Sequence, residues 1–219
     1  MKTDAQIQMD VIQELKWDPS VTHEHIGVAV SGGIVTLSGT VPSYIEKSAA
    51  EKAAQRVAAV KAVVEKIEVK LPGSLERDDQ DIARTIIDQF RWHSQVSDDL
   101  VKASVENGWV DLTGEVEWEF QRSAAENAVT GLMGVKGITN QIAIKPKVVQ
   151  PSVVKDNIEE ALKRAAEREA NRIGIEVRGS RVILSGKVRS FAELRDVKGA
   201  VWNAPGVASV DYDNLMVAV

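Results

Sequence analysis

The chain of 219 residues contains no cysteine, three histidines and few aromatic side chains. The absence of cysteine excludes disulfide bonds, thiolate metal sites, a cysteine nucleophile and a lipid anchor attached to cysteine. No run of apolar residues approaches the roughly 18 that a membrane span needs, so we expect no transmembrane segment. Aromatic residues make up only 5% of the chain, yet five of them are tryptophan.

The first ten residues also lack the apolar stretch of a secretory signal. They read Met-Lys-Thr-Asp-Ala-Gln-Ile-Gln-Met-Asp, with acids and amides where a signal peptide is apolar. We therefore expect a cytoplasmic protein as the sequence stands. If a signal peptide was removed ahead of this start, the expectation changes to a periplasmic protein.

The net charge of −5 is spread unevenly along the chain. The ratio of Lys+Arg to Asp+Glu is 8 to 9 in residues 1–72, 8 to 13 in residues 73–150 and 11 to 10 in residues 151–219. A nucleic-acid-binding domain is typically clearly basic, so we expect no nucleic-acid partner.

A stretch ending in Ser/Thr-Gly-x-Val occurs three times along the chain. Its glycines are Gly39, Gly114 and Gly186, which lie 75 and 72 residues apart. Self-similarity at a nearly constant period indicates tandem structural units of about 70 residues. The predicted modules are residues 1–72, 78–146 and 152–219.

Each predicted module has the order helix, strand, strand, helix, strand. In the first module the pattern predicts an amphipathic helix from Asp4 to Trp17, a hairpin of strands 26–30 and 34–41, and a helix from Ser43 to about Ala59. One apolar face on each helix and one on a three-stranded sheet predict an α+β fold. We thus expect three tandem two-layer modules, with the repeated glycines at a bulge or a close backbone approach.

Other details follow from the alignment of the modules. Ser43 with Glu46, and Ser190 with Glu193, have the spacing of a capping box at the start of the second helix. The closing strands of the second and third modules are predicted at residues 138–144 and 215–219. The expected core includes the aligned triplets Leu37/Leu112/Leu184, Val41/Val116/Val188 and Val60/Val135/Val207.

This pattern resembles the BON domain, which is named for bacterial osmotically induced and nodulation-type proteins. The resemblance rests on the Val-x-Leu-Ser/Thr-Gly-x-Val stretch, the Ala/Glu-rich helix after it, and the Ala-Val or Gly-Val step before the last strand, and it covers essentially the whole chain. The steps are Ala59-Val60, Gly134-Val135 and Gly206-Val207. The resemblance implies association with phospholipid surfaces, support of the envelope under osmotic stress, or a chaperone-like role in the periplasm. It implies no catalytic residue.

Four tryptophans lie near the ends of predicted elements. Trp17 and Trp92 occupy equivalent positions at the end of the first helix, where the third module has Arg164. Trp109 follows the second hairpin turn, and Trp118 stands where a polar helix cap is expected. A tryptophan at such a place suits a membrane or protein interface, because one part of the ring is apolar and the indole N–H is polar. Alternatively, Trp17 and Trp92 cover their own cores.

A basic run in the third module is a further candidate surface. Arg164, Arg168 and Arg172 share one face of the predicted helix, and each cation near an anionic membrane contributes about 1 kcal/mol. Interleaved glutamates favour the alternative of a solvated helix with internal ion pairs.

Nothing in the sequence indicates catalysis or a metal site. His23-Glu24-His25 offers two imidazoles, whereas zinc needs three or four convergent ligands. Ser38, Thr113 and Ser185 recur beside the repeated glycine, but no histidine recurs with them as a base. We therefore expect no enzyme activity and no cofactor.

Three hypotheses for function remain open. The first is a stress-protective binding protein of BON type whose partner is a phospholipid surface or an envelope protein. The second is a self-assembling or protein-interaction scaffold, since open sheet edges can pair with another chain and produce a homo-oligomer. The third is a chaperone-like factor that holds apolar segments of other proteins.

Overall fold

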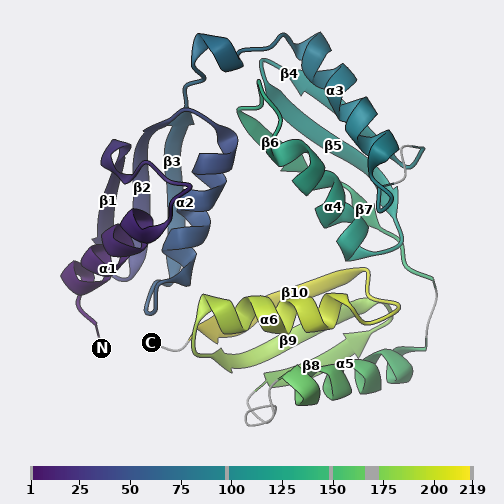
Figure 1. Cartoon of the computed structure of the whole chain (residues 1–219). Helices are drawn as coiled ribbons and strands as arrows, with labels where there is room; N and C mark the ends of the chain where they lie inside the picture. Colours follow the sequence, from purple (N-terminus) through teal and green to yellow (C-terminus); the bar gives the residue numbers. More distant parts are fainter. Residues whose placement is uncertain (1, 97–98, 148–149, 166–172, 218–219) are drawn as a thin grey trace.

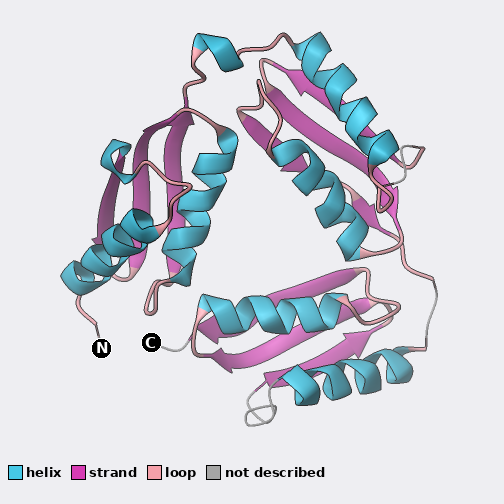
Figure 2. Ribbon diagram, in the orientation of Figure 1, coloured by secondary structure: helices cyan, strands magenta, loops and turns pink. Residues whose placement is uncertain are grey.

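The computed structural model describes residues 2–96, 99–147, 150–165 and 173–217. Within these residues the chain forms three small sheets, each packed against two helices (Figures 1 and 2). The α+β class and the repeated order helix, strand, strand, helix, strand are confirmed. We refer to the repeats as modules 1, 2 and 3.

The elements are as follows. Module 1 contains α1 (Asp4–Trp17), η1 (His23–His25), β1 (Ile26–Ser31), β2 (Ile34–Val41), α2 (Tyr44–Arg56) and β3 (Ala62–Val69). A short helix, η2 (Gly73–Leu75), leads to module 2, which contains α3 (Asp79–Trp92), β4 (Val101–Glu106), β5 (Trp109–Val116), α4 (Glu119–Thr130), β6 (Gly137–Asn140) and β7 (Ala143–Ile144). Module 3 contains α5 (Pro151–Ala165), β8 (Ile173–Arg178), β9 (Arg181–Val188), α6 (Phe191–Trp202) and β10 (Ser209–Val217).

The three sheets share one topology. The first two strands of each module form an antiparallel hairpin, and the second strand pairs in parallel with the strand that follows the second helix. That helix makes the crossover that parallel strands require. The middle strand therefore carries the most buried side chains. The nine aligned core residues expected from the sequence are confirmed, since none is more than 4% exposed.

The first helix of modules 1 and 2 also holds the hairpin turn of the same module. The carboxylate of Asp4 accepts hydrogen bonds from the backbone N–H groups of Gly32 and Gly33, at 2.8 and 3.0 Å. In module 2, Asp79 occupies the same place and accepts from the N–H groups of the Asn107-Gly108 turn at 2.7 and 2.8 Å. Module 3 has a proline at the corresponding position 151, so this contact belongs to two modules only.

Two predicted strands need correction. The strand expected at 138–144 is divided, because the side-chain oxygen of Asn140 accepts the backbone N–H of Ile142 and β6 ends there. The closing strand of module 3 begins at Ser209 rather than at Leu215, and its pairing with β9 shifts between Asp211 and Asn214. The alternation of apolar and polar residues is interrupted at this irregularity, so the sequence pattern did not indicate the first half of β10.

The predicted capping boxes are half formed. Ser43 and Ser190 do accept the backbone N–H groups of Glu46 and Glu193, at 3.3 and 3.2 Å. In a complete capping box the glutamate also accepts the backbone N–H of the serine, but here each glutamate accepts a different N–H group. Glu46 is 6% exposed and accepts the N–H of Thr22 at 2.6 Å, which ties α2 to the segment before β1. Glu193 accepts the N–H group one residue before the cap, at 2.6 Å.

The modules are arranged around a common centre, and α2, α4 and α6 face inward (Figure 1). Aromatic side chains join them. Tyr44 of α2 and Trp202 of α6 pack against the core of module 2, and Phe191 of α6 packs against the core of module 1. Each module consequently contacts both of the others.

Candidate interaction surfaces

The outward face of α1 carries an exposed apolar and basic group. The buried face of this helix carries Ile7, Val11 and Leu15. At 100° per residue, Ile12 lies about 100° from the middle of this stripe in one direction and Trp17 about 120° in the other, with Lys16 between them on the solvent side. Ile12 is 41% and Trp17 80% exposed, and Lys16 is exposed as well. The indole of Trp17 therefore meets solvent at the end of the helix.

Module 2 repeats this group on α3. Ile87, Arg91 and Trp92 stand at the positions of Ile12, Lys16 and Trp17, 75 residues later. Ile87 is 50% and Trp92 89% exposed. The interpretation that Trp17 and Trp92 cover their own cores is wrong, because the two residues are largely exposed and neither packs against a core. We call the two groups of three residues the outer tryptophan faces.

Module 3 differs at the same positions. It has Glu159, Lys163 and Arg164 in place of the isoleucine, the cation and the tryptophan. Arg164 lies in α5, but its side chain is outside the described part of the structure, and Arg168 and Arg172 lie outside the described residues. The basic face expected there remains a prediction.

Trp109 and Trp118 lie near opposite ends of the middle strand of module 2. The indole N–H of Trp109 donates to the hydroxyl of Thr139 at 2.7 Å, and its ring covers Gly137 so closely that a Cβ there would lie 2.3 Å from a ring carbon. Trp109 thus has a packing role across two strands, although it is 46% exposed. Trp118 is half-buried and stacks on Phe120, with ring centroids 6.5 Å apart. The structure does not gather the four tryptophans into one patch.

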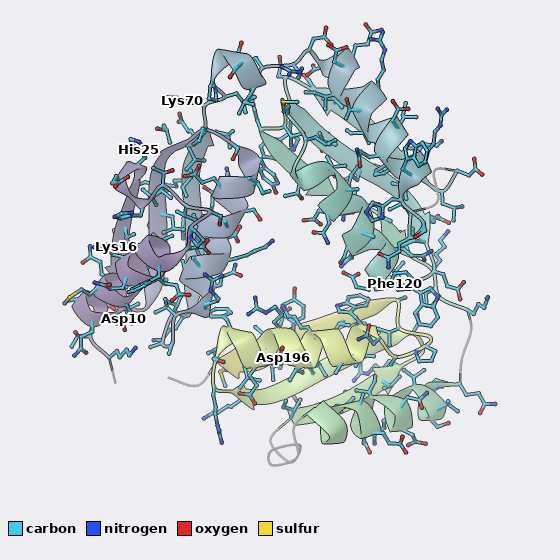
Figure 3. The ribbon with its side chains drawn as sticks, in the orientation of Figure 1. Asp10, Lys16, His25, Lys70, Phe120 and Asp196 are labelled. Carbon is cyan, nitrogen blue, oxygen red and sulfur yellow. The ribbon has the colours of Figure 1, made fainter. Side chains whose placement is uncertain are left out.

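A cleft of about 750 Å³ lies between α4 of module 2 and α6 and β10 of module 3. Phe120 points from the start of α4 toward module 3 (Figure 3). It lines the cleft together with Trp202 and Tyr212, and the residues Phe120 and Tyr212 are 50% and 41% exposed. We call this the inner cleft. None of its residues was singled out by the sequence reasoning.

Three cations lie among these rings. The guanidinium of Arg122 lies 5.3 Å from the ring centroid of Trp202 and pairs with Glu119 at 2.8 Å. The ammonium of Lys198 lies 3.4 Å from the ring centroid of Tyr212. Arg195 lies one turn before Lys198 on α6 and is exposed. No carboxylate of the described residues is within ion-pair distance of Arg195 or Lys198.

The junction of modules 1 and 2 has the opposite charge. Burial raises the pKa of the Tyr44 hydroxyl, and the carboxylates of Glu126, Glu51 and Glu65 raise it further. The inward helices thus present acids beside Tyr44 and bases on α6. A bound anion is favoured at the α6 side and disfavoured at the other.

His23 and His25 lie in the short helix η1, not in an extended segment, and nowhere in the described ranges do three or more His, Asp or Glu side chains converge as metal ligands. Within the same ranges, no helix has both the length and the hydrophobicity to span a bilayer.

Comparison with known proteins shows the following similarities. The family model described as "BON domain" matches residues 3–70, 78–146 and 152–218. The chain is 29% identical over 149 residues to osmotically-inducible protein Y of Escherichia coli (strain K12), and this alignment covers 65% of the chain and 73% of that protein.

Two solved structures of CdsD, a structural protein of the type III secretion system of Chlamydia trachomatis, are also similar. One is 16% identical, with 96% of this chain and 92% of that chain covered and a TM-score of 0.26. The other, its C-terminal domain, is 13% identical, with 99% and 100% covered and a TM-score of 0.27. No inference about this chain follows from TM-scores this low.

Proposed function

Because this chain belongs to the BON domain family, we propose that it is a non-enzymatic, stress-protective protein that associates with phospholipid surfaces through its outer tryptophan faces. The similarity to an osmotically-inducible protein supports the role in stress. The observation that carries the proposal is the repetition of an exposed isoleucine, cation and tryptophan on α1 and α3.

The repetition matters because folding does not require it. Large apolar side chains that remain exposed lower solubility unless they contact something else, and contiguous exposed patches mark interaction sites. Module 3 has the same helix without the isoleucine and the tryptophan, so the module fold tolerates their absence. The two faces are therefore best explained by a contact outside the chain.

The chemistry of each face fits a lipid headgroup region. Tryptophan is enriched at membrane interfaces, where its ring is shielded from water while its N–H remains hydrated. Lys16 and Arg91 lie one residue before the two tryptophans, where each can contribute about 1 kcal/mol to binding an anionic surface. A vesicle that contacts both faces would be bound more tightly than by either face alone, because the second contact occurs at a high effective concentration.

The test is flotation of the full chain with vesicles of phosphatidylcholine alone or mixed with phosphatidylglycerol. We expect salt-sensitive flotation with the anionic vesicles, weakened several-fold by Trp17→Ala or Trp92→Ala and abolished by the double substitution. Met216→Ala removes a side chain that is 58% exposed on β10 and serves as the matched control. Unchanged flotation of the double variant would refute the proposal.

The same preparation discriminates the other hypotheses by multi-angle light scattering. A mass well above 23.9 kDa without flotation would favour a self-assembling scaffold. A monomer that suppresses aggregation of an unfolded client, again without flotation, would favour a chaperone-like factor.

A further inference from the structure

We propose that the inner cleft between α4 and α6 binds one small organic anion that carries an aromatic ring. This site is separate from the outer tryptophan faces, and it uses residues of modules 2 and 3 together. The proposal rests on three observations: two cations without a carboxylate partner, their restriction to module 3, and the aromatic rings around them.

The first observation concerns charge. Arg195 and Lys198 lie three residues apart on α6 and both line the cleft, so they share one helix face. Arg122 on the facing helix is paired with Glu119 at 2.8 Å, whereas no carboxylate of the described residues pairs with Arg195 or Lys198. Lys198 is instead held over the ring of Tyr212, which orients the ammonium without neutralising it. The two positive charges are thus available to an anion.

The second observation comes from the repeat itself. The positions that correspond to Lys198 carry Glu126 in module 2 and Glu51 in module 1, and those that correspond to Arg195 carry serine in both. The module fold therefore accepts an acid where module 3 has Lys198. At the position of Trp202, module 2 has a threonine and module 1 has a glutamine. At these three positions the residues are basic or aromatic in module 3 alone, and all three border the cleft.

The third observation concerns the shape and lining of the cleft. Its volume of about 750 Å³ lies within the range of small-molecule sites, about 300–1,000 Å³. Phe120 and Tyr212 present large exposed ring surface to it, and Trp202 contributes a third ring. Aromatic rings attract flat aromatic partners in offset or edge-to-face arrangements. An aromatic anion matches both the rings and the charges.

Isothermal titration calorimetry of the full chain with three probes tests this assignment. Naphthalene-2-sulfonate has both the ring and the charge, octyl sulfate has the charge and an aliphatic chain, and inorganic phosphate has the charge alone. We expect naphthalene-2-sulfonate to bind with one-to-one stoichiometry and more tightly than either other probe. If it fails to bind at millimolar concentration, or if phosphate binds as tightly, the proposal is wrong.

The repeat supplies substitutions that the fold already accepts. Lys198→Glu and Arg195→Ser introduce residues of the other modules, and each should weaken the binding of naphthalene-2-sulfonate by about tenfold or more. Phe120→Ile introduces the residue that module 1 has at position 45, and it should weaken the aromatic probe while leaving octyl sulfate unchanged.

Lys102→Glu on β4 is the matched control, since it makes the same charge change on an exposed residue that does not line the cleft. It should leave binding nearly unchanged. If Lys102→Glu weakens binding as much as Lys198→Glu, the effect comes from net charge and the site is refuted. Thermal unfolding of each variant shows that it is folded. Because this site is separate from the outer tryptophan faces, Lys198→Glu should float with vesicles as the parent chain does.

Discussion

The substitution Gly114→Ala is expected to destabilise module 2 severely. Gly114 has a φ of +135°, a conformation in which a side chain is strained by about 1–3 kcal/mol. An added Cβ would also lie 2.1 Å from the carbonyl oxygen of Leu100, far inside van der Waals contact. That oxygen accepts the N–H of Glu115 at 3.3 Å, so moving it away loses a hydrogen bond of about 1 kcal/mol. The sum is a loss of about 2–4 kcal/mol in the free energy of unfolding.

Urea denaturation followed by tryptophan fluorescence measures this loss, because module 2 contains three of the five tryptophans. Gly32→Ala is the control that separates backbone strain from the close contact. Gly32 has a φ of +60°, but an added Cβ would meet nothing within 4 Å, so its cost is about 1–2 kcal/mol. A Gly114→Ala variant no less stable than Gly32→Ala would show that the contact with Leu100 is unimportant.

Two further predictions concern contacts within modules 1 and 2. Asp79→Ala removes two hydrogen bonds to the hairpin turn, and a decrease of about 1–2 kcal/mol in the free energy of unfolding is expected in urea denaturation. Hydrogen bonds from Ser20, followed by the guanidinium of Arg56, lower the pKa of Asp18 in the folded protein. The stability that Asp18 provides is therefore present above its unfolded pKa of about 3.9 and is lost as the pH falls through the lower folded value. Thermal unfolding of Asp18→Asn should be less sensitive to pH in this acidic range than that of the parent protein, and an identical pH profile would contradict the assignment.

The fold was predictable because its determinants are local and occur three times. An apolar stripe on each first helix, a glycine-containing hairpin turn and the repeated glycine each indicate one element, and three copies agree. The prediction failed where a side chain formed a hydrogen bond with a backbone N–H group that the local sequence pattern does not indicate. Asn140 interrupts a strand by bonding the N–H of Ile142, and Glu46 bonds Thr22 instead of its own helix cap. Spacing identified Glu46 as important, but the choice between two N–H groups depends on the packing of a distant segment.

The surfaces were less predictable, for a related reason. Trp17 and Trp92 could be recognised from the sequence as equivalent, and their exposure followed once the buried stripe of each helix was known. The inner cleft could not be recognised, because its rings and charges come from two modules whose mutual placement depends on contacts such as that of Trp202 with the core of module 2. One signal was nevertheless present in the alignment of the repeats: Lys198 reverses the charge of Glu51 and Glu126. In a chain built from repeats, positions that diverge in charge while the core is kept mark where one copy has acquired a role that the fold does not demand.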